Sequence, residues 1–235
     1  MNILISGTSR GIGKAIAERL ITEGHKIFAT ARNEALLLGY ENYCVCDLAT
    51  NEGMQKLGNY IEEHNIDVLI NNAGEYIETP MTEAINLDEL EHCTKLNLQA
   101  PLYLISRAVP YMKTKRFGRI VNIGSISGVM GEAYASVYSA TKSGLIGATK
   151  ALALELAEYG ITVNTINPGW VETDLGNESI QNGEFTKDEI TACIPQKRFI
   201  APIEIADLVR YLISKEAKGF TGQSINLCAG LSVGY

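Results

Sequence analysis

Seven short apolar runs, separated by longer stretches of helical periodicity, constrain the fold of this chain more than any other feature. The runs are rich in Ile, Val and Leu and cover residues 2–6, 26–30, 43–46, 68–70, 119–123, 162–166 and 223–227. Helices are predicted at residues 10–23, 51–64, 87–113, 136–159 and 203–215. Short apolar runs are typical of strands buried on both faces of a parallel sheet. The alternation predicts one α/β domain, a doubly wound Rossmann-type fold with a seven-stranded parallel sheet.

The length and composition favour a single domain over residues 1–235. A chain of 235 residues, 46% of them hydrophobic, can bury one sizeable core without disulfides or metals. The one irregular stretch is 174–199, which is polar, contains glycine and is longer than an ordinary connection. Such loops often carry binding residues, so we expect residues 174–199 to form a lid over a substrate.

Charge and residue usage disfavour several classes of protein. The net charge of -7 and the scattered Lys and Arg residues argue against a nucleic-acid partner, which needs a basic face. No apolar stretch has the length of a membrane span, and the first strand runs directly into a glycine loop, so we expect a cytoplasmic protein without a signal peptide. The five cysteines form no C-x-x-C pair, which suits reduced thiols. No metal site is predicted, because His25, His64 and His92 lack a second ligand at metal spacing.

A glycine loop follows the first predicted strand directly and opens the first predicted helix. It has the spacing Gly7-x-x-x-Gly11-x-Gly13. Glycine is needed where a side chain would block a pyrophosphate from the backbone N–H groups and the helix N-terminus. A glycine-rich turn alone is weak evidence, but its position between a strand and a helix favours dinucleotide binding.

A second group of residues has the chemistry of proton transfer. Tyr138 and Lys142 are four residues apart on a predicted helix, so their side chains share one face. Ser125 ends a predicted strand thirteen residues before Tyr138, and Asn97 lies in an earlier helix. A Tyr and Lys pair at this spacing is common by chance, and the Ser and Asn give it weight.

In order and spacing, these segments resemble the short-chain dehydrogenase/reductase family along nearly the whole chain. The resemblance rests on six segments, namely the glycine loop, the Asn-Asn-Ala-Gly run at 71–74, Asn97, Ser125, Tyr138 with Lys142, and the Pro-Gly pair at 168–169 followed by Glu172 and Thr173. The G-x-x-x-G-x-G spacing is the version that this family uses. The resemblance implies a dinucleotide-binding and catalytic domain that reduces a carbonyl to a hydroxyl by hydride transfer.

The resemblance also implies a catalytic set of Asn97, Ser125, Tyr138 and Lys142. Tyr138 would be the general acid, and its phenol, with an ordinary pKa near 10, would need a lower pKa. We expect the Lys142 ammonium and the nicotinamide cation to lower it by about two units. Lys142 would also hold the nicotinamide ribose, Ser125 the substrate oxygen, and Asn97 a water chain to Lys142. The alternatives are that Ser125 is a turn residue with Ser127 in its role, and that Asn97 is an ordinary buried residue.

The cofactor is expected to lie along the carboxyl ends of the strands. Asp47 matches the family's adenine contact, 72–74 its turn beside the cofactor, and 168–169 its turn on the nicotinamide side. Glu172 is expected to face solvent. The predicted cofactor-binding residues are Gly7, Ser9, Arg10, Gly11, Ile12, Gly13, Arg32, Asp47, Leu48, Asn72, Ala73, Gly74, Tyr138, Lys142, Pro168, Gly169, Val171 and Thr173.

The end of the second strand indicates which nicotinamide cofactor is preferred. An acidic residue there would bind the ribose hydroxyls of NAD(H) and repel a 2′-phosphate, but the sequence is Thr30-Ala31-Arg32. Arg32 and Arg10 can instead make charge-assisted contacts to phosphate. We predict that NADP(H) is preferred and that NAD(H) is possible. The alternative is that both arginines are solvated surface charges.

Among family members, the chain looks like the bacterial 3-oxoacyl-[acyl-carrier-protein] reductases of fatty acid biosynthesis. The likeness lies in residues 160–164, 168–174 and 221–223, and in Arg116, which stands where that branch presents a cation to its acidic carrier. Tyr159 and Ala135 depart from the branch, which usually has a basic residue and a glutamine there. Reduction of a small ketone or oxidation of a small alcohol is the main alternative. A non-catalytic NADP-binding regulator and a lyase or epimerase are more remote ones.

The resemblance implies an assembly as well as a reaction. Relatives are commonly tetramers that pair the long helices containing Asn97 and Tyr138, so a homotetramer or homodimer is expected. The expected partner is a small-molecule or acyl-carrier-linked carbonyl substrate, with no nucleic acid and no membrane.

Overall fold

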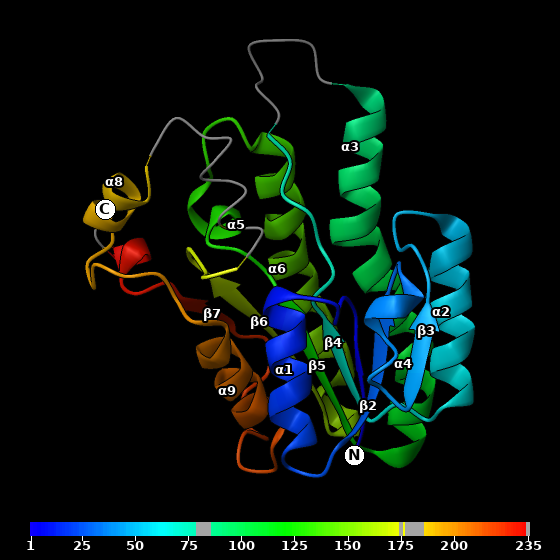
Figure 1. Cartoon of the computed structure of the whole chain (residues 1–235). Helices are drawn as coiled ribbons and strands as arrows, with labels where there is room; N and C mark the ends of the chain where they lie inside the picture. Colours follow the sequence, from blue (N-terminus) through cyan, green and yellow to red (C-terminus); the bar gives the residue numbers. More distant parts are fainter. Residues whose placement is uncertain (79–85, 174–175, 177–185, 234–235) are drawn as a thin grey trace.

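A single parallel sheet forms the centre of the computed structural model, which describes residues 1–78, 86–173, 176 and 186–233 (Figure 1). Its strands are β1 (Asn2–Ile5), β2 (Lys26–Ala31), β3 (Asn42–Val45), β4 (Val68–Asn71), β5 (Gly118–Ile123), β6 (Ile161–Pro168) and β7 (Ser224–Leu227). Their order is β3-β2-β1-β4-β5-β6-β7, and each neighbouring pair is parallel. The predicted seven-stranded doubly wound fold is confirmed.

Helices cover both faces of the sheet (Figure 1). On one face, α1 (Gly11–Ile21) packs beside α9 (Pro202–Ile213), and on the other α2 (Asn51–Glu63) packs beside α4 (Ala100–Lys115), with α6 (Ser136–Leu156) next to them. The strands are therefore apolar at successive positions. Ile3 and Ile5 belong to the cluster under α1 and α9, whereas Leu4 belongs to the cluster under α2 and α4.

The predicted long helix at 87–113 is interrupted in the structure. It consists of α3 (Leu87–Thr94), a π-helical turn η2 (Lys95–Gln99) and then α4. Periodicity gave no sign of the interruption, because a π-turn adds one residue without ending the helical path. Asn97 lies in this turn and is buried.

Short helical segments complete the chain. They are η1 (Glu34–Leu36), α5 (Ser127–Met130), η3 (Ala157–Tyr159), α8 (Lys187–Cys193) and η4 (Leu231–Val233). The segment at 157–159 lies within the predicted helix at 136–159, and periodicity predicted none of the others. A segment of one or two turns is too short to show a reliable period. The expected lid at 174–199 contains α8, but residues 174–175 and 177–185 lie outside the described residues.

The strand order creates a crevice at the carboxyl ends of the strands. β1 lies between β2 and β4, so the connections after β1 and after β4 lead to opposite sides. In parallel α/β sheets, ligands bind at such a switch point, at the carboxyl ends of the strands. In the part of the chain that the structure describes, no helix is long and apolar enough to cross a membrane.

Two adjacent leucines test the packing under α1. Leu37 is 0% exposed and belongs to the cluster under α1 and α9, whereas Leu38 is 70% exposed. Leu37→Ala should lower the free energy of unfolding by about 2–5 kcal/mol, because it leaves a cavity. Leu38→Ala should change it by less than about 0.5 kcal/mol. Urea denaturation of both variants measures the difference, and equal losses would contradict this packing.

Candidate active site

A cleft of about 750 Å³ runs along the carboxyl ends of the strands. It is lined by almost every residue predicted from the sequence, namely Gly7, Ser9, Arg10, Gly11, Ile12, Arg32, Asp47, Leu48, Asn72, Ala73, Gly74, Ser125, Tyr138, Lys142, Pro168, Gly169, Val171 and Thr173. Two of the predicted residues, Gly13 and Asn97, lie behind its wall and are buried. Glu172 is exposed, as expected.

The glycine loop is held tightly against helix α1. Gly7 has a φ of +74°, and a Cβ at Gly13 would lie 2.0 Å from the Gly7 carbonyl oxygen, so only glycine fits at position 13. The Asn72 side chain donates hydrogen bonds of 2.9 Å to the carbonyls of Ser6 and Gly7. These bonds fix the loop after β1 to the loop after β4. Gly13 therefore supports the cradle rather than lining it.

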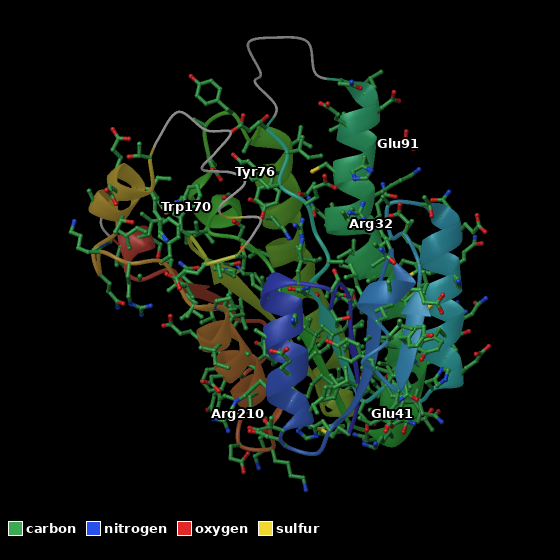
Figure 2. The ribbon with its side chains drawn as sticks, viewed as in Figure 1. Arg32, Glu41, Tyr76, Glu91, Trp170 and Arg210 are labelled. Atoms are coloured by element: carbon green, nitrogen blue, oxygen red, sulfur yellow. The ribbon has the colours of Figure 1, made fainter. Side chains whose placement is uncertain are left out.

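The start of α1 is suited to an anion. Among the described residues, no side chain caps the helix by a hydrogen bond and no acidic residue lies in its first turn. The first N–H groups and the positive end of the helix dipole are therefore left for another acceptor. Arg10 and the exposed Arg32 add positive charge along the same cleft. In Figure 2, Arg32 lies toward α2 and α3, well separated from Trp170.

The cleft thus has two different ends. Arg32, Asp47 and Leu48 line one of them, and Tyr76 and Trp170 line the other, above the sheet (Figure 2). The Asp47 carboxylate accepts a hydrogen bond of 3.0 Å from the Ala49 N–H, so it also shapes the turn into α2. The arginine end has the charge for phosphate, and the aromatic end has the apolar surface for an organic substrate.

Tyr138, Lys142 and Ser125 come together between these ends. Lys142 Nζ lies 5.6 Å from the centre of the Tyr138 ring and donates a hydrogen bond of 3.0 Å to the Ile123 carbonyl. A Cβ at Gly128 would lie 2.7 Å from the Lys142 Cβ, so α5 packs directly against α6. This close packing brings the loop that carries Ser125 to the face of α6 that carries Tyr138 and Lys142.

Burial controls the proton affinity of this group. It raises the pKa of Tyr138 to about 12, with further increases from the nearby Glu132 and Cys93 and an opposing hydrogen bond from Ser125. Burial also lowers the pKa of Lys142 to about 8. The expected lowering of the tyrosine pKa by Lys142 is therefore not produced by the protein's own groups, because desolvation outweighs it. The protein by itself holds Tyr138 as a neutral phenol.

Asn97 fixes the backbone beside Lys142. Its Oδ1 accepts a hydrogen bond of 3.0 Å from the Glu75 N–H, and its Nδ2 donates one of 2.9 Å to the Glu75 carbonyl. A Cβ at Gly74 would lie 2.9 Å from Asn97 Oδ1 and 3.2 Å from Lys142 Nζ, so Gly74 allows this close approach. The structure thus gives Asn97 a positioning role next to Lys142.

Several residues of the cleft were missed in the sequence. The Tyr76 ring packs edge-on against Tyr138, with 5.2 Å between the ring centres, and its hydroxyl donates to Glu132. Trp170 lines the cleft and stacks on Phe199. A signal for Glu132 was available, because it lies in the loop that joins Ser125 to Tyr138 and such a loop must border the site. The aromatic residues gave no comparable signal.

Comparison with known proteins gives consistent relatives. A family model described as enoyl-(acyl carrier protein) reductase matches residues 7–232. The chain is 38% identical to the 3-oxoacyl-[acyl-carrier-protein] reductase FabG of Rickettsia bellii, covering 97% of this chain and 95% of the relative. It is 33% identical to the corresponding reductase MabA of Mycobacterium bovis, covering 100% and 94%. The chain belongs to the short-chain dehydrogenase/reductase family.

Solved structures of this family superpose on the whole chain. A variant of actinorhodin polyketide ketoreductase, solved with NADPH, has a TM-score of 0.92 and 35% identity and covers 100% of this chain and 97% of its own. ElxO with NADP bound has a TM-score of 0.88 and 28% identity and covers 99% and 98%. The family and the oxidoreductase class predicted from the sequence are therefore confirmed.

The lowered pKa of Lys142 predicts that this residue destabilises the fold. Its folded pKa of about 8 lies below its ordinary 10.5, so the unfolded chain binds the proton more tightly. The resulting penalty is fully present below about pH 8 and disappears as the pH approaches 10.5. Lys142→Met should therefore raise the free energy of unfolding at pH 7 by about 1–3 kcal/mol, after allowance for the lost hydrogen bond.

The control is Lys150→Met, a change at an exposed position on the same helix. It should alter stability by less than about 0.5 kcal/mol. Urea denaturation at pH 7 and pH 10 measures both variants. A Lys142→Met protein less stable than the wild type at pH 7 would contradict the assigned desolvation.

Proposed function

We propose that this protein is an NADPH-dependent reductase that converts the 3-carbonyl of an acyl thioester to a hydroxyl. The observation that carries the proposal is the junction of a neutral Tyr138 phenol, Lys142 and Ser125 in the middle of a cleft with an arginine end and an aromatic end. The curated relatives are named as 3-oxoacyl-[acyl-carrier-protein] reductases, and a structural neighbour is a ketoreductase with NADPH. These names support the reaction and the cofactor.

The residues at the cleft fit NADPH. The uncapped start of α1 and the glycine loop that Gly13 allows to pack against it suit a pyrophosphate, and Arg32 suits a 2′-phosphate. When bound, NADPH supplies the hydride. The remaining predicted contacts, from Asp47 at the adenine end to 168–173 at the nicotinamide end, belong to this proposal.

The protein's own residues would supply and hold the proton. Ser125 and Tyr138 would bind the substrate oxygen by hydrogen bonds, and Tyr138 Oη would give its proton to the alkoxide as it forms. Lys142 would stabilise the phenolate that remains and orient the nicotinamide ribose. Asn97 would hold the Glu75 backbone in place beside Lys142, and a water chain through this region would return the proton.

The carrier-linked form of the substrate rests on the relatives' names rather than on Arg116. Arg116, which stands where the reductase branch presents a cation to its carrier, does not line the cleft. Arg116 directly precedes β5 at the amino edge of the sheet, and its guanidinium donates to the Glu158 carbonyl. The cleft lies past the other end of β5, about 20 Å away at the rise of a parallel strand. A carrier protein would therefore approach this cleft by another surface.

Location and assembly complete the proposal. We expect a cytoplasmic enzyme of fatty acid biosynthesis that forms a homotetramer or homodimer. The support is the resemblance to the reductase branch and the exposed sides of α4 and α6, where Leu102 and Leu154 are 37% and 84% exposed. Sedimentation of the purified protein measures the assembly.

Tyr138→Phe tests the reaction. The change removes only the transferable proton, so turnover of a 3-oxoacyl thioester should fall by about 10² or more while NADPH binding stays near normal. NADPH oxidation measures turnover, and cofactor fluorescence measures binding. Tyr134→Phe is a matched control, because Tyr134 is 65% exposed and does not line the cleft. Wild-type turnover in Tyr138→Phe would exclude the mechanism, and a wild type active only on small ketones would exclude the thioester substrate.

A double substitution tests the choice of cofactor. Ala31→Asp with Arg32→Ala places a carboxylate near the ribose and removes the phosphate contact. NADPH binding should weaken by about 1–3 kcal/mol relative to NADH. Arg210→Ala is the control, since Arg210 lies far from the cleft (Figure 2). Apparent Kd values for both cofactors measure the effect, and a wild type that prefers NADH would contradict the role of Arg32.

A further inference from the structure

A chain of hydrogen bonds leads from the proposed catalytic serine to a carboxylate. Ser125 Oγ donates to Ser127 Oγ at 3.0 Å, and Ser127 Oγ donates to Glu132 Oε2 at 2.5 Å. The Ser127 N–H also donates to Ser125 Oγ at 3.1 Å. Glu132 and Ser127 both line the cleft, although Ser127 is only 6% exposed. The serine is therefore connected to a charged group through a buried neighbour.

The Glu132 carboxylate determines which hydroxyl donates in each of these hydrogen bonds. An ionised carboxylate only accepts hydrogen bonds, so the Ser127 proton is committed to Glu132. Ser127 Oγ can then only accept from Ser125. Ser125 keeps the one serine proton that can turn toward a substrate oxygen. The sequence left open whether Ser125 or Ser127 binds the substrate oxygen, and this arrangement favours Ser125.

Glu132 also holds the aromatic side of the site. Its Oε1 accepts a hydrogen bond of 3.2 Å from the Tyr76 hydroxyl, and the Tyr76 ring packs edge-on against Tyr138. The Glu132 carboxylate is thus bonded to Tyr76, which packs against Tyr138, and to Ser127, which accepts from Ser125. Removing it would release both contacts together.

Glu132 is the group that brings negative charge to Tyr138. The groups that face Tyr138 are Lys142 on the same helix, Cys93 from α3, Tyr76 from the loop after β4, and Ser125 and Glu132. Burial raises the pKa of the Cys93 thiol and the pKa of the Tyr76 phenol, so both are neutral near pH 7. A negative charge beside a phenol favours its protonated form.

We propose that Glu132 is a positioning residue of this active site, which commits the Ser127 proton, holds Tyr76 over Tyr138 and keeps Tyr138 in its proton-donating form. Its effect on the reaction rests on the proposed function of Ser125 and Tyr138. Its effect on the Tyr138 proton does not, because that can be measured without substrate or cofactor. The proposed function and the role of Glu132 can therefore be disproved separately.

The first experiment follows the tyrosine protons by ¹⁹F NMR in protein grown with 3-fluorotyrosine, whose more acidic phenol titrates at a lower pH than that of tyrosine. Glu132→Gln keeps the side-chain size and removes the charge, so Tyr138 and Tyr76 should both titrate at lower pH, by about half a unit or more. Signals are assigned with Phe variants. Tyr60, which Glu132 does not affect, is the internal control.

The matched control variant is Glu78→Gln, the same change at another carboxylate of the cleft. Glu78 acts on Tyr76 but not on Tyr138. It should move the titration of Tyr76 and leave that of Tyr138 in place. A Tyr138 titration that is the same in the wild type and in Glu132→Gln would overturn the proposal.

The second experiment separates charge from position by activity. In Glu132→Gln, reduction should lose rate at a lower pH than in the wild type, because Tyr138 loses its proton earlier. In Glu132→Ala, turnover should fall about tenfold or more across the pH range, because Ser125 and Tyr76 both lose their anchor. Ser127→Ala combined with Glu132→Ala should cost less than the sum of the two single changes.

The outcomes are distinct. Additive losses and an unchanged pH profile would mean that Glu132 has only a structural role, and would overturn the proposal. A wild type without NADPH-dependent reduction would instead overturn the proposed function, and the NMR titration would still decide the effect of Glu132 on Tyr138.

Discussion

The rest of the site depends on the close contact between the loops that follow β1 and β4. Gly13 lets α1 approach the Gly7 carbonyl, and Asn72 bridges the two loops through the carbonyls of Ser6 and Gly7. Backbone groups that would otherwise be unsatisfied at the edge of the sheet are paired in this way. With the loops fixed, the start of α1 faces the cleft. Asn97 Oδ1 and Lys142 Nζ both approach the place that a side chain at Gly74 would occupy.

Desolvation then sets the chemistry at the centre of the cleft. The same burial raises the pKa of Tyr138 to about 12 and lowers the pKa of Lys142 to about 8, so it moves the two proton affinities apart. The phenol is therefore the group of the pair that holds its proton more tightly, and Lys142 loses its proton first as the pH rises. In a polar, open site the same two residues would keep nearly equal pKa values, close to their ordinary 10.0 and 10.5.

The fold and the side of the cleft formed by the glycine loop could be predicted from the sequence, because both depend on local patterns. Strands such as β1, buried on both faces, leave uninterrupted apolar runs, and the glycine loop needs its glycines at fixed spacing. Tyr76, Trp170 and the π-turn at Asn97 left no such pattern, because tertiary packing alone places them. The phenol pKa was misjudged because charge is visible in a sequence and desolvation is not. Arg116 was placed by the resemblance alone, although a residue that precedes β5 lies at the amino end of the strand, away from the carboxyl ends that border the cleft.

The π-turn between α3 and α4 has a consequence for which side each helix turns to its neighbours. One residue more than an α-helical turn holds is accommodated in Lys95–Gln99, so the faces of α3 and α4 are out of phase by about 100°. α4 therefore keeps its packed side on α2 while α3 turns another side toward α6, and Cys93 comes close to Tyr138. Without the extra residue, the same contact of α4 with α2 would turn Cys93 away from Tyr138.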